Sequence, residues 1–415
     1  MTRSPLPPVP ARDMAVDLLV IGAGTGMGAA LAAHERGLST LIVEKTEFVG
    51  GSTARSGGAF WIPANPVLME NGSTDSLEQG ERYLRAAVGD SSPEARWQAF
   101  LANGKAAIDL LRRTTPLTFQ WTKGYSDYHP ELAGGTAVGR TCEPRPFDVS
   151  VLGEERNRLR SAGVEAPVPM PVTSADYKWM NLMFRIPHRG VPRVVKRFAQ
   201  GLGGLALRRE YSSAGHALAA GLFAGVLEAG VPVWTCTAVD RLLTGEGGRV
   251  TGAVLTQNGR EVTVTARRGV VLATGGFDHD MDMRHKFQLE ATQPGWSLGS
   301  EGNTGDGIKV GEEVGAATAL MDQAWWFPEV APPPGGAPSV LLAERSLPGQ
   351  FIVDGSGRRF VNEALDYMSF GQLVQERERA GDPVGDMWMV FDRGYRNSYV
   401  FAGSLLPRMP LPKAW

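Results

Sequence analysis

The sequence predicts an α/β fold built on a mostly parallel sheet, and three observations near its start support this prediction. Residues 18–21 and 40–43 are short apolar runs, which are typical of buried parallel strands. The glycines that follow the first run are Gly22, Gly24, Gly26 and Gly28. Small helix-forming residues come next, and Glu44 stands at the end of the second run. A strand, a glycine turn, a helix and a second strand in this order predict a Rossmann-like unit.

The glycines have separate roles in the predicted site. Gly22 permits the tight turn after the strand, and Gly24 lets a pyrophosphate approach the backbone because it has no Cβ. The unpaired N–H groups at the helix N-terminus then face the pyrophosphate. The third fingerprint position is Met27, a departure that Gly26 and Gly28 on either side can offset. A glycine-rich turn that binds nothing is the alternative, and the flanking strands and the acidic residue disfavour it.

Glu44 and the loop that follows it indicate which nucleotide binds. An acidic side chain at this strand end hydrogen-bonds the ribose hydroxyls and repels a 2′-phosphate. After Lys45, residues 50–58 form a second Gly/Ser loop, where an NAD domain usually continues into a helix. Such a loop can line an extended flavin dinucleotide, so the sequence favours FAD. The candidate cofactor-binding residues are Gly22, Gly24, Gly26, Glu44, Lys45, Gly51, Ser52, Ser56, Gly57, Gly58, Val239, Thr274, Gly275 and Asp306.

Length and composition bound the class of protein. The chain has 415 residues, 43% hydrophobic and 21% charged, which is typical of a globular protein with two or three domains. A net charge of −2 gives no general attraction to nucleic acid. Cys142 and Cys236 are too few for a disulfide framework and fit a reducing, cytoplasmic location. No membrane span or signal peptide is predicted, and residues 1–14 are expected to form a disordered tail.

Helices and strands alternate through the middle of the chain. The expected helices cover residues 74–88, 92–113 and 215–229. Asp75 or Ser76 caps the first, and Ser92 caps the second with Pro93 at its first position. The expected strands cover residues 231–235, 250–255, 261–266 and 270–276. The last strand ends in glycines beside the cofactor, and Asp306 opens a further helix from which it can hydrogen-bond the cofactor.

Two segments each admit two interpretations. Residues 121–130 are too aromatic for a solvated loop, and Tyr125 and Tyr128 either plug a core edge or line a flat, apolar substrate cavity. Residues 177–209 mix basic side chains with aromatic and methionine side chains. They form either an ordinary solvated helix face or a lid or membrane-surface element.

Residues 278–285 contain acids and histidines in a pattern that suggests a metal site. The acids lie just after Gly276, where a helix should begin, so capping and the helix dipole explain them. A third ligand cluster is missing, and no metal is predicted.

The composition changes beyond Asp322 and predicts a domain boundary near residue 323. Trp- and Pro-rich residues follow over 325–336, then a strand over 349–354, a helix from about Ser369 and a strand over 387–391. We therefore expect a FAD-binding domain over 15–323 and a catalytic domain over 324–415.

Several motifs resemble the 3-ketosteroid Δ1-dehydrogenase family, within the flavoproteins related to fumarate reductase. The resemblance covers residues 15–415 and is carried by residues 50–63, 124–128, 320–326 and 362–367. The glycine motifs are shared by the whole flavoprotein group, whereas the two motifs that contain Tyr128 and Tyr367 discriminate the family. The resemblance implies a Rossmann-like FAD-binding domain with a β-meander, and an α+β, fumarate-reductase-like catalytic domain.

The resemblance also implies a mechanism. A 3-ketosteroid loses a hydride from C1 to the flavin N5 and a proton from C2, which the neighbouring ketone acidifies. Tyr367 is implied as the proton acceptor and Tyr128 as its supporting residue. A lone phenol, with a pKa near 10, is a poor base at neutral pH, and a second hydroxyl can stabilise the phenolate. Tyr125, Trp325 and Phe327 are expected to extend the apolar wall.

Members of the family continue past the point where this chain stops, so the resemblance predicts a chain truncated at its C-terminus and an incomplete catalytic domain. The absent part would supply a glycine-rich segment over the flavin and a pair of groups that polarise the ketone. A fumarate-reductase-like oxidoreductase and an inactive flavin-binding remnant are the alternative functions. The implied partners are a 3-ketosteroid and an electron acceptor such as a quinone.

Overall fold

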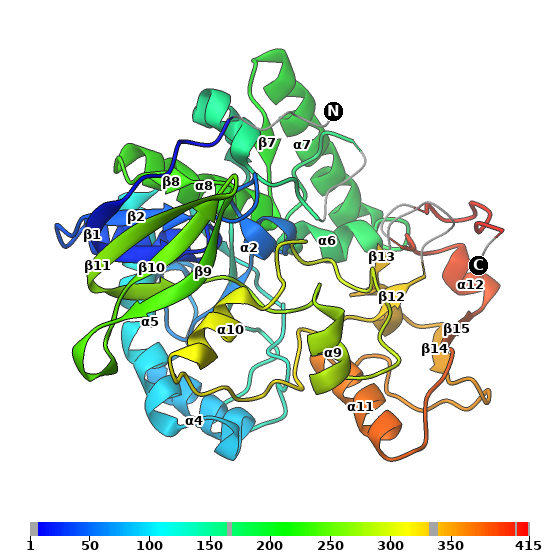
Figure 1. The fold of residues 1–415 in the computed structure, drawn as a ribbon. Helices are drawn as coiled ribbons and strands as arrows, with labels where there is room; N and C mark the ends of the chain where they lie inside the picture. Colours follow the sequence, from blue (N-terminus) through cyan, green and yellow to red (C-terminus); the bar gives the residue numbers. More distant parts are fainter. Residues whose placement is uncertain (1–6, 164–167, 332–338, 403–404, 414–415) are drawn as a thin grey trace.

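A six-stranded sheet forms the centre of the N-terminal part of the molecule. The computed structural model describes residues 7–163, 168–331, 339–402 and 405–413. In order across the sheet, the strands are β8 (Val233–Trp234), β2 (Thr40–Val43), β1 (Met14–Ile21), β11 (Arg260–Leu272), β10 (Val250–Gln257) and β9 (Thr237–Thr244). The first four pair in parallel, and β11, β10 and β9 form an antiparallel meander. The predicted Rossmann-like unit with a β-meander is confirmed (Figure 1).

Helices and short strands surround this sheet. The helices are α1 (Gly26–His34), α2 (Gly51–Arg55), α3 (Pro66–Glu70), α4 (Leu77–Val88), α5 (Glu94–Thr114), α6 (Ser174–Asn181), α7 (Pro187–Ala206), α8 (Ala214–Glu228), α9 (Met281–Phe287), α10 (Asp306–Glu313), α11 (Tyr367–Arg379) and α12 (Arg393–Arg396). The short strands are β3 (Phe60–Trp61), β4 (Phe119–Trp121), β5 (Thr141–Pro144), β6 (Phe147–Asp148), β7 (Tyr211–Ser212), β12 (Glu329–Val330), β13 (Ser339–Val340), β14 (Gln350–Val353) and β15 (Trp388–Phe391).

The alternation of side chains along β1 divides the core into two layers. Val20 faces one apolar cluster, which α1 and α8 cover with Met27 and Phe223. Leu19 and Ile21 face a second cluster on the meander side of the sheet. Because both faces are covered, the strand is apolar over its whole C-terminal half, as the sequence indicated.

The structure differs from the predicted strands at two places. The segments predicted at 261–266 and 270–276 are one strand, β11, which pairs with β1 from Met14↔Val264 to Ile21↔Leu272. The register shifts between Val16 and Leu18, and this irregularity lets one long strand serve both the parallel sheet and the meander. Strand β9 was not predicted, because only one of its residues is buried and it shows no clean apolar alternation.

The helix predictions hold with small shifts at the caps. Ser76 caps α4, accepting a hydrogen bond from the Gln79 N–H at 3.2 Å. Pro93, rather than Ser92, is the N-cap residue of α5, so the helix begins one residue later than predicted. The glycine face of α8 packs closely: a Cβ at Gly215 would lie 2.0 Å from the Thr53 carbonyl oxygen.

The N-terminal segment differs from the predicted tail. Residues 1–6 lie outside the described residues, but Ala11 is buried and its N–H donates to the Gln257 side chain at 2.8 Å. Gln257 in turn donates to the Val9 carbonyl. Residues 7–13 therefore lie against the meander, and β1 begins at Met14.

The C-terminal part has apolar clusters of its own, coloured orange to red at the right of Figure 1. One cluster surrounds Tyr395 and includes Leu182 from the end of α6, and the other packs Ile352 against Phe370 of α11. The domain boundary near residue 323 stays a prediction. The proline-rich runs at 166–171 and 331–336 lie partly outside the described residues.

We expect Gly22→Ala to lower the midpoint of thermal unfolding by several degrees. Gly22 has φ +109°, and a Cβ would lie 2.2 Å from the Ala273 carbonyl oxygen, so strain of about 1–3 kcal/mol is expected. The matched control is Gly28→Ala, whose Cβ would meet no atom within 4 Å. Alanine favours this helical position by up to about 1 kcal/mol, so the control should keep or raise the midpoint. Equal effects of the two substitutions would contradict the constraint at Gly22.

Candidate functional site

The carboxyl ends of three parallel strands converge on the glycine turn. The Gly22 N–H donates to the Val43 carbonyl of β2 at 2.8 Å, and the Ala273 N–H after β11 donates to the Ile21 carbonyl of β1 at 2.7 Å. Thr274 and Gly275 follow directly, so two more of the predicted residues lie at this edge. Ligands of open parallel sheets bind at such a carboxyl edge, where the strand order reverses.

Gly26 and Met27 explain how the turn departs from the fingerprint. A Cβ at Gly26 would lie 2.8 Å from Val20 and 3.0 Å from Ala273, so Gly26 is the glycine that lets α1 pack on the sheet. Met27 is fully buried in the core. We expected Gly26 or Gly28 to compensate for Met27 at the third fingerprint position, and Gly26 is the one that does so.

The Glu44 carboxylate is held at the turn, and one of its two oxygens accepts only a single hydrogen bond. Its Oε1 accepts hydrogen bonds from the Thr46 N–H and hydroxyl, at 2.9 and 2.8 Å. Its Oε2 accepts one long bond, 3.1 Å, from the Ala23 N–H. A carboxylate oxygen can accept more than one donor, so Oε2 has capacity for a ribose hydroxyl.

The second Gly/Ser loop contains a short helix, α2, beside the first turn. Gly24 lies against this loop, because a Cβ there would meet the Thr53 hydroxyl at 3.4 Å. Gly58 has φ +68° and packs against Ala214, whereas a Cβ at Gly57 would point into open space. Ser56 is exposed, and its hydroxyl donates to the Thr53 carbonyl at 2.8 Å and accepts from the Gly58 N–H at 3.0 Å. The predicted loop therefore has a packed side and an open side.

Lys45 and Asp306 are brought together across the chain. Lys45 Nζ lies 2.5 Å from both Asp306 Oδ2 and the Thr304 hydroxyl. Asp306 is the first residue of α10, as predicted. Val239 differs from the other predicted residues, because its side chain packs on the apolar cluster of the meander, opposite Leu255.

Sequence reasoning missed the segment 297–303, which lies beside α2. Ser52 accepts hydrogen bonds from the Ser300 N–H and from Asn303 Nδ2, both at 2.9 Å. Arg55 donates to the Leu298 carbonyl at 2.6 Å. The run Gly-Ser-Glu-Gly-Asn-Thr-Gly at 299–305 is rich in backbone-exposing and hydroxyl residues and was the available signal.

These residues fit FAD. The glycine turn leaves room for a pyrophosphate, Glu44 offers an acceptor for a ribose, and Gly57 and Gly28 leave space where a side chain would stand. When bound, FAD supplies a hydride acceptor.

Two predicted tyrosines meet at the second half of the site. The hydroxyls of Tyr128 and Tyr367 are hydrogen-bonded to each other, although 239 residues separate them in the chain. Their rings lie edge to face, with centroids 5.1 Å apart. Tyr367 is the first residue of α11, where the free N–H groups of the helix give a partial positive charge. The pair predicted from separate motifs therefore forms one hydrogen-bonded unit.

Other aromatic residues surround the pair to different degrees. The ring of Phe327 stacks on Tyr367 with centroids 4.5 Å apart, and Tyr125 also interacts with the Tyr367 hydroxyl. Trp325 is 68% exposed, so it is not packed with them. Its neighbour Trp326 packs inward instead, against Gly371 of α11. The substrate-wall interpretation is favoured for Tyr125 and Phe327 and not for Trp325.

A buried arginine fixes the loop that carries Tyr125 and Tyr128. Arg140 is fully buried and contacts Asp127 within the loop and Asp75 at 2.9 Å. Its remaining nitrogen donates to the Gly134 carbonyl at 2.7 Å. A buried charge with two carboxylates and a carbonyl is satisfied, and removal of one partner would leave an uncompensated charge.

A second buried arginine, Arg345, supports Tyr367 and was not predicted. Its guanidinium donates to the carbonyls of Glu363 at 2.7 Å and of Leu365, in the segment that leads into α11. Among the described residues, its hydrogen bonds go to backbone carbonyls, and no carboxylate lies within ion-pair distance. Its charge interacts with the Asp366 carboxylate first and then with Tyr125, Glu344 and Tyr367. It lowers the pKa of Tyr125 against the larger effect of burial. A charged pair at 344–345 after an apolar run was the available signal.

Burial raises the pKa of both Tyr125 and Tyr128, and the neighbouring Tyr367 hydroxyl adds to the effect. Both phenols therefore keep their protons at neutral pH. A neutral hydroxyl on Tyr128 can donate a hydrogen bond to its partner, which is the supporting role that the resemblance implied.

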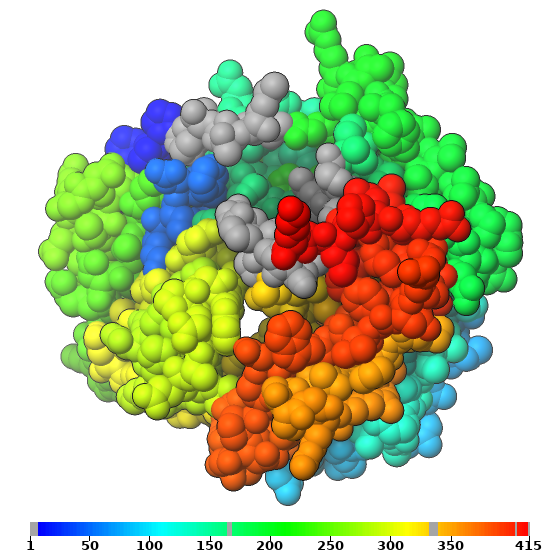
Figure 2. Space-filling view, turned by 90° about the vertical axis from the view of Figure 1, so that its right-hand side faces the viewer, coloured from blue at the N-terminus to red at the C-terminus, as the bar shows by residue number. Residues whose placement is uncertain are grey.

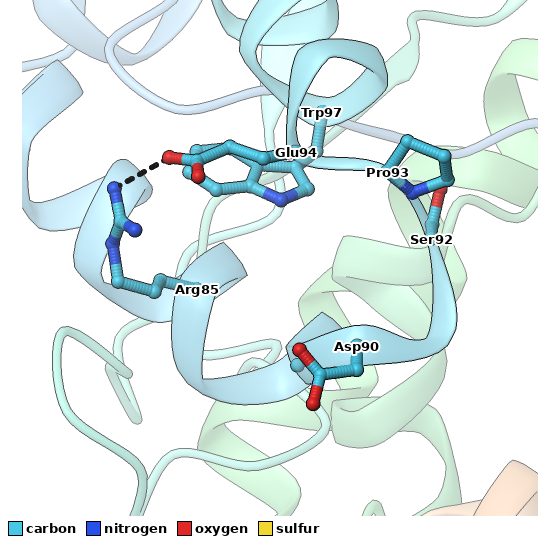
Figure 3. Close-up of a pocket in the computed structure, with 7 residues that line it drawn as sticks. Arg85, Asp90, Ser92, Pro93, Glu94 and Trp97 are labelled. Atoms are coloured by element: carbon cyan, nitrogen blue, oxygen red, sulfur yellow. Dashed lines mark hydrogen bonds and ion pairs between the residues drawn. The ribbon is translucent and has the colours of Figure 1, made fainter.

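Other candidate groups lie apart from this site. Asp280 caps α9, accepting from the Met283 N–H at 2.9 Å, as the capping interpretation of the acidic cluster predicted. In the described part of the chain, no group of three or more potential metal ligands is found. Both cysteines are free, and burial raises the pKa of the Cys142 thiol to about 12. A hollow of about 410 Å³ at the α4–α5 corner contains the Arg85–Glu94 ion pair and none of the predicted residues (Figure 3).

Comparisons with known proteins agree with this geometry. A family model described as FAD binding domain matches residues 17–403. The chain is 40% identical over 410 residues to a 3-oxosteroid 1-dehydrogenase of Mycolicibacterium smegmatis, over 96% of this chain and 71% of that protein. It is 41% identical over 409 residues to a 3-oxosteroid 1-dehydrogenase of Mycobacterium tuberculosis, over 96% and 72% of the two chains.

A solved structure is also similar over most of the chain. It is the 3-ketosteroid delta1-dehydrogenase of Sterolibacterium denitrificans in complex with 1,4-androstadiene-3,17-dione, with a TM-score of 0.89 and 35% identity. The match covers 97% of this chain and 73% of that chain. Fold and site together define a FAD-dependent flavoprotein with a fumarate-reductase-like architecture. The chain belongs to the 3-oxosteroid 1-dehydrogenase family.

We expect Glu44→Ala to weaken FAD binding about tenfold or more. A hydrogen bond to a charged group contributes about 1.5–3 kcal/mol, and Glu44 offers such an acceptor at the turn. Titration of the apoprotein with FAD, followed by flavin fluorescence, measures the effect. Glu47→Ala, at an exposed position three residues on, is the matched control. If both variants bound FAD equally weakly, the affinity would depend on negative charge near the turn and not on a hydrogen bond to the Glu44 carboxylate.

The raised pKa values of Tyr125 and Tyr128 predict a loss of stability at alkaline pH. The folded phenols hold their protons more tightly than unfolded ones, so their contribution is complete below about pH 10 and is lost as pH rises further. The thermal midpoint should therefore fall above about pH 10, and less steeply in Tyr128→Phe. If folded Tyr128 gave its phenolate absorbance at about pH 10, the buried environment would be contradicted.

Proposed function

We propose that this protein catalyses the FAD-dependent 1,2-dehydrogenation of 3-ketosteroids. The observation that carries the proposal is the hydrogen-bonded Tyr128–Tyr367 pair, which joins the two motifs that discriminate the family. When bound, FAD would accept the hydride that leaves C1, while a proton leaves C2. The proton goes to Tyr367, and Tyr128 shares and passes it on through its hydroxyl. The catalytic roles of these two residues are part of the proposal.

The surroundings of the pair support this assignment of roles. A phenol needs help to accept a proton at neutral pH, since its ordinary pKa is near 10. The N-terminus of α11 and the buried guanidinium of Arg345 place positive charge near Tyr367, where the N-cap residue Asp366 partly balances it. Phe327 and Tyr125 give the pair apolar, flat surfaces that suit a ring system.

The cofactor half and the tyrosine half lie on neighbouring parts of the molecule. Figure 2 shows a hollow between the yellow-green segment and the orange-to-red C-terminal part. Gln372 of α11 donates to Gln323 at 3.1 Å, and Arg379 pairs with Asp322 at 3.2 Å. These contacts support a substrate position between the predicted FAD site and α11.

The electron acceptor and the location are further parts of the proposal. Reduced FAD must pass two electrons to an acceptor, and we propose a quinone. Two free cysteines support a reducing, cytoplasmic setting. In the part of the chain that the structure describes, no helix combines the length and apolar character needed to cross a bilayer.

We expect Tyr367→Phe to slow anaerobic flavin bleaching by 4-androstene-3,17-dione by about 100- to 10,000-fold, the usual contribution of a general base. Tyr128→Phe should slow it less, because it removes the support and not the acceptor. Tyr395→Phe is the matched control: this buried phenol donates to the Glu344 carbonyl and lies in a separate cluster.

Two outcomes would overturn the proposal. One is a flavin-loaded protein that the steroid does not bleach, which would favour a flavin-binding protein without this activity. The other is a protein that turns over fumarate and not the steroid, which would favour the fumarate-reductase-like alternative.

A further inference from the structure

The small sheet formed by β12 and β13 has two different faces (Figure 1). Side chains of successive strand residues point to opposite faces of a sheet. Val330 of β12 lies on one face and packs, with Leu341, in the cluster around Tyr395. Glu329 precedes Val330 and lies directly opposite Val340 on the neighbouring strand. Glu329 and Val340 therefore lie on the other face of the β12–β13 sheet.

Phe327 lies on the same face as Glu329. The Leu341 N–H donates to the Pro328 carbonyl at 2.9 Å, so the pairing of the strands continues to the residue between them. Two residues along a strand span about 7 Å and return the side chain to the same face. The Phe327 ring stacks on Tyr367 with centroids 4.5 Å apart. The face that carries Glu329 is therefore turned toward the tyrosine pair.

The Glu329 carboxylate lacks a protein partner on this face. Glu329 is half-buried, and across the described residues no hydrogen bond or ion pair reaches its carboxylate. Burial alone raises its pKa, and no neighbouring charge contributes. A carboxylate that loses water without gaining a donor is destabilised, which makes such a group beside a catalytic pair a candidate for binding. Because Phe327 and Val340 are apolar, the donor that Glu329 lacks can come from a bound molecule.

We propose that Glu329 is a specificity-determining residue, whose carboxylate accepts a hydrogen bond from a hydroxyl group at C17, the end of the steroid remote from C1 and C2. This role rests on the proposed function, in which the C2 proton leaves to Tyr367. Glu329 lies about 7 Å farther along the β12–β13 sheet than Phe327, and a fused four-ring substrate extends beyond that separation. An ionised carboxylate only accepts hydrogen bonds, so it favours a hydroxyl over a ketone at the same carbon.

Two steroids that differ only at C17 test this role with the flavin-loaded protein. Testosterone carries a hydroxyl at C17, and 4-androstene-3,17-dione carries a ketone there. Anaerobic flavin bleaching over a range of concentrations gives a half-saturating concentration and a limiting rate for each steroid. We expect Glu329→Gln to shift the ratio of the half-saturating concentrations about tenfold or more against testosterone, since a hydrogen bond to a charged group is lost. The limiting rates should not change, because the reacting C1–C2 bond is elsewhere.

Two further variants separate the carboxylate from general effects. Glu329→Asp keeps the charge and should keep more of the preference for testosterone than Glu329→Gln does. Glu378→Gln makes the same chemical change at a half-buried position in the last turn of α11, away from the β12–β13 sheet. This control should leave the ratio at its wild-type value.

Three results would overturn this role for Glu329. They are equal changes for the two steroids, the same shift in Glu378→Gln, and a loss in Glu329→Asp as large as that in Glu329→Gln. Failure of the proposed function is seen separately, because neither steroid would then bleach the flavin of the wild-type protein. Equilibrium dialysis of the oxidised, flavin-loaded protein with each steroid measures the ratio of affinities without turnover. A ratio that Glu329→Gln does not change there would overturn the role even if both steroids bleached the flavin.

Discussion

The close approach of two strand ends at Gly22 is the constraint on which the cofactor half depends. A Cβ at Gly22 would lie 2.2 Å from the Ala273 carbonyl oxygen, so β1 and β11 can end side by side only with glycine there. That approach brings Thr274 and Gly275 to the same edge as the glycine turn. Glu44 reaches this edge from β2 and accepts the Ala23 N–H. The cofactor site is thus a consequence of strand pairing, with few side chains specialised for it.

The tyrosine half depends on buried charge rather than on strand pairing. Tyr128 lies in a loop, and a loop keeps one conformation only when its buried polar groups have hydrogen-bond partners. Arg140 provides such partners by pairing with Asp127 and Asp75, whose side chains are buried with it. Arg345 does the same for the segment before α11 through two backbone carbonyls. Two buried arginines therefore fix the geometry of the pair.

Helix α6 connects the tyrosine half with α7. The Tyr177 hydroxyl donates to Glu344 at 3.1 Å, next to Arg345, and Leu182 packs in the cluster around Tyr395. The following helix, α7, is held on α6 by the Arg197–Asp176 ion pair at 2.6 Å. Helix α6 therefore contacts both α7 and the segment that contains Arg345.

The sequence by itself determined the Rossmann-like unit and the FAD cofactor, because their signals are local. Glycine turns, short apolar strands and an acidic residue at a strand end each lie within a few residues, and the strand–turn–helix order fixes their positions. The motifs with Tyr128 and Tyr367 also named the pair through resemblance, but only the tertiary structure decided that their hydroxyls meet across 239 residues. It also decided that Phe327 rather than Trp325 packs with them, that β9 and β11 complete the meander, and that Arg140 and Arg345 are buried. These features depend on long-range burial and register, for which a single sequence carries no local pattern.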